Sequence, residues 1–113
     1  MKSHRPERLA EKIRMELGRL ISRDVRDPRV GFTTITAVNL TRDLRQARVM
    51  ISVIGTAEEE EESLRRLRAA SRFLRHELSR SLTLRFTPEL SFELDRTYQN
   101  VDRVEELLKR IKK

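Results

Sequence analysis

The residues most able to do chemistry in this sequence are arginines that follow one another closely in its second half. Between Leu64 and Thr87 the only acid is Glu77, and there is no lysine. Arginine carries a planar fork of N–H donors that fits a phosphate group and can stack on a nucleobase. This stretch therefore indicates an anionic, phosphate-rich partner. Its arginines are Arg65, Arg66, Arg68, Arg72, Arg75, Arg80 and Arg85.

The predicted binding surface extends beyond this stretch. A second basic cluster closes the chain, a third lies near its start, and two arginines sit in a predicted hairpin turn. The plainer alternative is that such a charge run is only a solvated helix face. We predict phosphate contacts from Arg65, Arg68, Arg72, Arg75, Arg80 and Arg85, outer contacts from Arg5, Arg8, Lys109, Arg110, Lys112 and Lys113, and additional ones from Arg42 and Arg45.

Few aromatic residues accompany these charges, since the chain has one tyrosine and four phenylalanines. A stacking platform of the RRM type is therefore not indicated. Recognition of the backbone and shape of structured RNA fits the composition better.

Catalytic and metal-binding patterns are scarce. There is no cysteine, and the two histidines, His4 and His76, fall in different predicted elements, so we expect no metal site and no cofactor. Three glycines form neither a phosphate-binding loop nor a nucleophile elbow. Two carboxylate pairs could in principle hold magnesium or act as acid and base, namely Asp24 with Asp27 and Asp43 with Asp95. Their positions beside predicted turns favour a structural role, so we predict that the protein is not an enzyme.

Length and composition are typical of one domain with a strongly ionic surface. The chain has 113 residues, of which 38% are charged, and a net charge of +7. No apolar run approaches a membrane span, and the first residues lack the apolar core of a signal peptide. We therefore expect a cytoplasmic location with no membrane contact.

The elements that must position the arginines follow from hydrophobic spacing. An amphipathic helix is predicted from about Pro6 to Val25, with Gly18 as a candidate close-packing point. Residues Thr33–Leu40 and Leu44–Ile54 predict an antiparallel hairpin with one buried face. A loop is expected over Gly55–Glu62, where the acidic block Glu58–Glu62 also suits the first turn of a helix.

The second half predicts the rest of an α+β layer. Leu64, Leu67, Leu74 and Leu78 form one helical face, interrupted by small residues near Ala70. Leu90, Phe92 and Leu94 alternate as a third strand, and residues 101–111 repeat with helical spacing. The prediction is a three-stranded sheet covered by helices on one face.

Together these segments resemble the bacterial ribosome-binding factor A family. The matching motifs, in order, are DPRVGFTTITAV at Asp27–Val38, DLRQARV at Asp43–Val49, LRAASRFLRHEL at Leu67–Leu78, LRFTPELSFELD at Leu84–Asp95 and RVEELL at Arg103–Leu108. They span nearly the whole chain.

The resemblance implies a single type II KH-like domain over residues 1–113, with the order α-β-β-α-kink-α-β and an added C-terminal helix. In this family a kink between two helices replaces the usual GxxG loop. The family's Ala-x-Gly kink aligns with Ala70, Ser71 and Arg72, so arginine replaces glycine here. Arginine adopts left-handed backbone geometry at a higher cost than glycine, so the kink is expected to be shallower or to rely on Ser71 as a helix cap. Ala70, Ser71 and Arg72 are included in the predicted RNA-binding site.

For function, the resemblance implies a maturation factor of the small ribosomal subunit. Such a factor binds the free or precursor 30S subunit and its 16S rRNA, aids late processing near the 5′-terminal helix, supports growth in the cold, acts as a monomer, and is released with the help of a ribosome-associated GTPase. Three alternatives stay open: a general KH-like module for single-stranded nucleic acid, a protein-binding module that uses Glu58–Glu62 and the arginines of Leu64–Thr87, and a remote nuclease.

Overall fold

The computed structural model describes residues 5–23 and 32–95. Their elements are α1 (Arg5–Arg23), β1 (Phe32–Leu40), β2 (Gln46–Ile54), α2 (Ala57–Ala69), α3 (Ser71–Ser81) and β3 (Glu89–Leu94). The predicted α+β class is confirmed. The predicted C-terminal helix and the basic cluster that contains Lys109, Arg110, Lys112 and Lys113 lie outside the described residues.

The three strands form one mixed sheet in the order β1-β2-β3. The predicted hairpin is confirmed, because β1 pairs antiparallel with β2 from Phe32↔Ile54 to Leu40↔Ala47. The register shifts between Ile35 and Ala37, which places a bulge at Thr36. β3 pairs parallel with β2, so α2 and α3 together form the connection between these strands.

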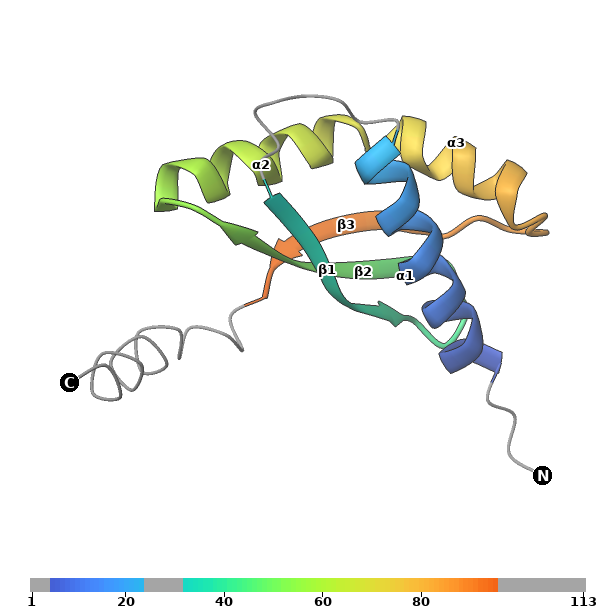
Figure 1. The fold of residues 1–113 in the computed structure, drawn as a ribbon. Helices are drawn as coiled ribbons and strands as arrows, with labels where there is room; N and C mark the ends of the chain where they lie inside the picture. The colour runs from blue at the N-terminus through green and yellow to red at the C-terminus, as the bar shows by residue number, and fades with distance from the viewer. Residues whose placement is uncertain (1–4, 24–31, 96–113) are drawn as a thin grey trace.

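All three helices cover the same face of the sheet (Figure 1). The predicted periodicities explain this packing, because the residues at helical spacing and those at alternate strand positions meet in one core. The core is formed by Ile13, Leu17, Leu20, Ile21, Ile35, Val38, Ala47, Val49, Ile51, Leu64, Leu67, Leu74, Leu78 and Phe92. One detail of the prediction is wrong: a Cβ at Gly18 would meet no atom within 4 Å from another element of the described chain, so Gly18 marks no close contact there.

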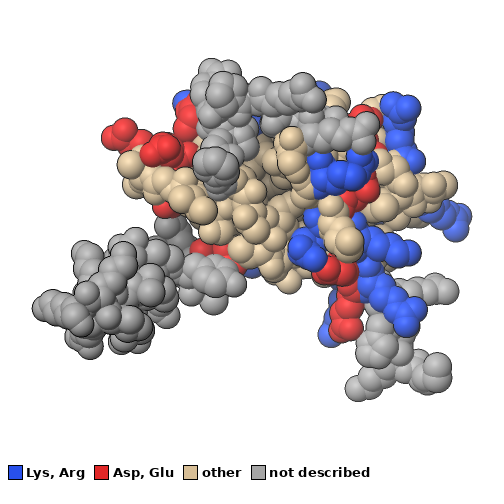
Figure 2. All heavy atoms as spheres, viewed as in Figure 1, with Lys and Arg blue, Asp and Glu red and all other residues tan. Residues whose placement is uncertain are grey.

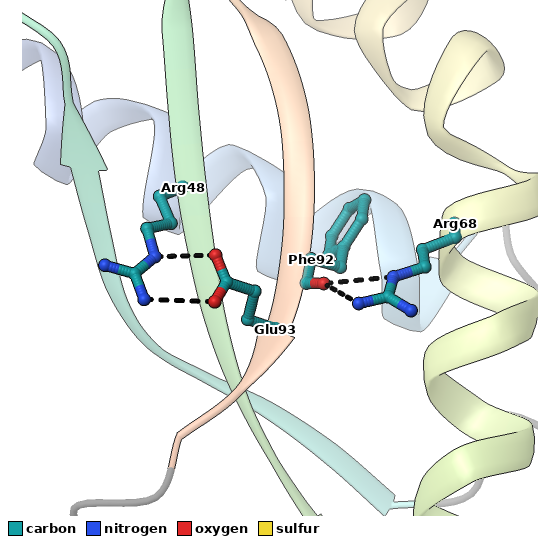
Figure 3. Close-up of polar contacts among 4 residues, drawn as sticks. All are labelled: Arg48, Arg68, Phe92 and Glu93. Carbon is teal, nitrogen blue, oxygen red and sulfur yellow. Dashed lines mark hydrogen bonds and ion pairs between the residues drawn. The ribbon is translucent and has the colours of Figure 1, made fainter.

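The opposite face of the sheet carries polar side chains. There Arg48 holds Glu93 with two charge-assisted hydrogen bonds, Nε to Oε2 at 2.6 Å and Nη2 to Oε1 at 3.0 Å (Figure 3). The Arg48 guanidinium lowers the pKa of Glu93 below its ordinary value. Thr36, at the bulge, donates from its hydroxyl to the Asp95 carboxylate.

The loop predicted over Gly55–Glu62 is wrong for most of its length, because α2 begins at Ala57. A capping box explains the early start. The Glu59 N–H donates to Thr56 Oγ1 at 3.2 Å, and the Thr56 N–H donates to Glu59 Oε1 at 3.0 Å. The acidic residues Glu58, Glu59 and Glu60 occupy the first helical turn, where the macrodipole favours them. No helix in the described part of the chain is long and apolar enough to span a bilayer.

Candidate nucleic-acid interface

The joint between α2 and α3 lies at a single residue, Ala70 (φ −88°, ψ 1°). The Ala70 N–H donates to the carbonyls of Arg66 (3.0 Å) and Leu67 (3.1 Å) and so closes α2. The Ala70 carbonyl accepts from the Leu74 N–H at 2.9 Å and so begins α3. The chain therefore passes from α2 to α3 without a residue in the left-handed region.

Arg72 therefore does not occupy the kink itself. It is the second residue of α3, and among described non-glycine residues only Leu44 and Thr83 have positive φ. The expected left-handed cost at Arg72 does not arise, and Ser71 is the first helical residue rather than the cap. No side chain caps the start of α3, and its first turn contains no acid. The Arg72 side chain is exposed and makes no hydrogen bond or ion pair with any other described residue.

Two predicted phosphate ligands already bind backbone carbonyls next to the outer sheet edge. Arg68 donates from Nε (3.2 Å) and Nη2 (3.1 Å) to the carbonyl of Phe92 in β3 (Figure 3). Arg75 donates in the same way to the carbonyl of Thr87, at 3.2 Å from Nε and 2.9 Å from Nη2. Each guanidinium has five N–H donors, so each keeps Nη1 free of these bonds. Both arginines thus link the helices to the segment that carries the edge strand.

Other arginines between Leu64 and Thr87 pair with acids on their own helix. Arg65 and Arg66 both contact the Glu62 carboxylate, and Arg66 Nε lies 3.0 Å from Glu62 Oε1. Arg80 Nη1 lies 3.6 Å from Glu77 Oε2. Arg65 and Arg80 remain 72% exposed, so these surface pairs leave both side chains accessible.

The remaining described candidates are distributed over α1, the β1–β2 turn and the α3–β3 loop. Arg8 and Arg42 are exposed and, like Arg72, make no hydrogen bond or ion pair with another described residue. The structure brings Arg45, Arg75 and Arg85 together around one groove, whereas Arg65 and Arg68 border a shallower hollow with Glu58, Glu61 and Glu62. For Arg5 only the backbone, at the start of α1, is described.

The basic side chains are concentrated at one end of the molecule. Figure 2 shows blue side chains gathered over the end formed by α1 and α3, with some red ones among them, and further red ones over the start of α2. The sequence analysis did not predict that Glu62 forms ion pairs with Arg65 and Arg66. Its spacing of three and four residues from these arginines is the pattern that indicates such pairs on a helix. The carbonyls of Phe92 and Thr87 left no such signal, because any residue type supplies a carbonyl.

The carboxylate pairs weighed as catalytic candidates do not form a site in the described residues. Asp43 accepts from the Thr41 hydroxyl (2.6 Å) and the Arg45 N–H (3.1 Å), and these hydrogen bonds lower its pKa. Asp95 instead accepts from Thr36 on the sheet. No group of three His, Asp or Glu side chains suited to a metal occurs in residues 5–23 and 32–95. Asp24 and Asp27 lie outside the described residues.

The order of elements, the mixed three-stranded sheet and the joint at Ala70 define a KH-like α+β domain of the type II arrangement. Comparison with known proteins specifies the family. The model of the ribosome-binding factor A family matches residues 5–108. Ribosome-binding factor A of Desulforamulus reducens is 45% identical over 109 residues, which are 96% of this chain and 91% of that protein. The chain belongs to the ribosome-binding factor A family.

Solved structures agree with this assignment. The crystal structure of ribosome-binding factor A from Thermus thermophilus has a TM-score of 0.71 at 29% identity, covering 79% of this chain and 94% of that one. A Thermus thermophilus ribosome binding factor A homology model, fitted into a cryo-EM map of its complex with the 30S subunit, has a TM-score of 0.67 at 30% identity, covering 77% and 91% of the two chains. The expected KH-like fold is confirmed.

Proposed function

We propose that this protein is a non-enzymatic assembly factor that binds 16S rRNA in the free or precursor 30S subunit. The observation that carries the proposal is the basic surface of α3, with Arg72 exposed at an uncapped helix start and Arg75 and Arg80 further along the same helix. The Thermus thermophilus relative fitted into a map of a 30S complex supports the choice of partner.

Arg72 is the residue best placed to hold a phosphate. The first N–H groups of a helix lack partners within it, and the macrodipole favours an anion there. An exposed guanidinium in the same turn adds charge and further donors. Arg65, Arg68, Arg80 and Arg85 would add contacts along the RNA backbone, with Arg8, Arg42 and Arg45 on neighbouring elements and Arg5, Lys109, Arg110, Lys112 and Lys113 as outer contacts.

A general single-stranded nucleic-acid module is the second candidate, and the joint at Ala70 argues against it. There a single residue connects α2 to α3 in place of the GxxG loop of general KH modules.

The proposed role has finer parts that rest on the family. The protein would act as a cytoplasmic monomer through one domain, without cofactor or membrane contact. It would aid late processing near the 5′-terminal helix of 16S rRNA, matter most in the cold, and leave the subunit with the help of a ribosome-associated GTPase.

Co-sedimentation with mature and precursor 30S particles and with free 16S rRNA fragments, across a salt series, tests the role. We expect stronger binding to precursors, and a steep loss with salt because several phosphate contacts release counterions. Arg72→Ala should weaken binding and reduce the salt slope by about 1. Arg14→Ala, which removes an arginine paired with Glu11 on α1, is the matched control. Binding that ignores salt, or equal binding to any single strand, would contradict the role.

A further inference from the structure

A groove lies where the β1–β2 turn meets the α3–β3 loop. It has a volume of about 710 Å³, which is in the range of small-molecule sites, and a mostly apolar lining. Leu9 of α1, Leu44 of the turn, and Leu84 and Phe86 of the loop form the apolar part, while Arg45, Arg75 and Arg85 border it. Size and lining suit a flat, partly apolar group that carries negative charge nearby.

The walls of this groove are held in place before any ligand binds. The Glu89 N–H donates to the Arg45 carbonyl at 2.8 Å and joins the turn to the loop. Arg75 fixes the loop from α3 through the Thr87 carbonyl. Inside the turn, the Gln46 N–H donates to Thr41 Oγ1 at 3.1 Å. The cost of ordering the two loops is therefore already met in the free protein.

Two features of the groove are typical of a ligand-binding site. Phe86 is 74% exposed although it is a large apolar side chain, and among the exposed large hydrophobic residues described only Phe86 lines the groove. The two described non-glycine residues with positive φ, Leu44 (61°) and Thr83 (50°), lie in the same turn and loop. Backbone strain of this kind is concentrated at ligand-binding sites.

The charges select the kind of ligand. Three arginines border the groove, against the acids Asp43 and Glu89. The Asp43 carboxylate is already engaged by the Thr41 hydroxyl and the Arg45 N–H. The Arg85 guanidinium carbon lies 5.7 Å from the centre of the Phe86 ring, so a cation and an aromatic face stand side by side. Proteins hold unpaired bases with aromatic rings and arginine planes of this kind.

We propose that this groove receives one unstacked nucleobase of 16S rRNA, which stacks on Phe86 while Arg45, Arg75 and Arg85 contact the flanking phosphates. The inference rests on the proposed function and adds a second mode of contact to it. The surface of α3 around Arg72 contacts the phosphate backbone of the RNA, whereas the groove holds one unpaired base.

Phe86→Ala tests the groove in 30S co-sedimentation, with Ile54→Ala as the control because Ile54 is similarly exposed (76%, against 74% for Phe86) and lies at the end of β2, away from the groove lining. We expect Phe86→Ala to bind roughly tenfold more weakly, and Ile54→Ala to bind like the parent protein. Thermal unfolding should show both variants folded, since neither side chain is in the core. If Phe86→Ala binds as tightly as the parent while Arg72→Ala binds more weakly, the groove inference fails and the proposed function stands. If the parent protein does not bind 30S particles, both fail.

A fluorescence measurement distinguishes a base from a protein ligand. The chain has no tryptophan, so Phe86→Trp introduces a single indole into the groove. Stacking on a base quenches indole emission, and we expect strong quenching when 30S particles are added to Phe86→Trp but little change for Ile54→Trp. A blue shift without quenching would indicate an apolar protein contact and would overturn the assignment of a base.

Discussion

At the scale of single residues, the arginines differ in what their guanidinium groups already contact. Arg68 and Arg75 bind backbone carbonyls, Arg65 and Arg66 share Glu62, and Arg72 has no such partner in the described chain. The sequence places these arginines in one positive stretch but does not separate their roles, because the carbonyls that bind Arg68 and Arg75 belong to residues 24 and 12 positions further along the chain. Arg72 is therefore the sharpest test of RNA binding.

Arg72→Gly restores the glycine of the family's kink and tests the backbone at the joint. Because Arg72 has right-handed helical geometry, glycine relieves no strain there and loses conformational entropy on folding. We expect the free energy of unfolding to fall by up to about 1 kcal/mol. Urea unfolding of Arg72→Gly beside Arg72→Ala measures this difference, and a more stable glycine variant would mean that the joint is strained.

Glu59 gives a prediction about pH. Hydrogen bonds from the Thr56 N–H and the Thr56 side chain hold the pKa of Glu59 below its ordinary 4.5. A carboxyl group with a lowered folded-state pKa contributes stability that is complete above its unfolded pKa and is lost as pH falls through the folded value. Glu59→Gln keeps an acceptor for the Thr56 N–H but does not titrate. Its melting temperature should therefore fall less than that of the parent protein below pH 4.5. Parallel pH curves for the two proteins would contradict this.

At the scale of elements, the hydrophobic spacing predicted α1, the three strands and the helical segment that contains α2 and α3, because burial of one face is encoded directly in residue type. The division of that segment into two helices was implied only by the family resemblance. The boundaries were harder. The start of α2 was missed because Thr56 and Glu59 form a capping box inside a highly acidic run, whose charge suggested a loop. The kink was located correctly near Ala70, but its conformation depends on a backbone angle that residue type does not fix.

Arg68 links α2 to β3, and substitutions of this residue separate its effect on stability from the effect of its charge on RNA binding. Arg68→Lys keeps the positive charge but cannot reproduce the two-pronged hydrogen bond to the Phe92 carbonyl. We expect Arg68→Lys and Arg68→Ala both to lose about 1 kcal/mol of stability in urea unfolding. Only Arg68→Ala should also reduce the salt slope of 30S binding. Full stability of Arg68→Lys would show that charge alone suffices at this edge.

At the scale of the whole molecule, one core supports every surface discussed above. Phe92 is 1% exposed in β3 and belongs to the cluster formed by all three helices and the sheet. Phe92→Ala should cost about 3 to 5 kcal/mol, a large share of the roughly 5 to 15 kcal/mol that stabilises a typical domain. Circular dichroism should show a much lower melting temperature, and 30S binding should fall only where the variant is unfolded. A loss of binding by folded Phe92→Ala would assign this residue a direct role.

The parallel pairing of β2 with β3 also bears on how the chain acquires its shape as it is synthesised. The hairpin of β1 and β2 needs only residues 32–54, so it can close early and by local contacts. β3 pairs with β2 only after the intervening helices have emerged, because the partners Gln46 and Glu89 are separated by the whole of α2 and α3. Until then one side of β2 is an open edge in the nascent protein. The docking of β3 should be the slowest step of folding. The entropy cost of closing the long connection arises before the stabilising contacts between β2 and β3 form.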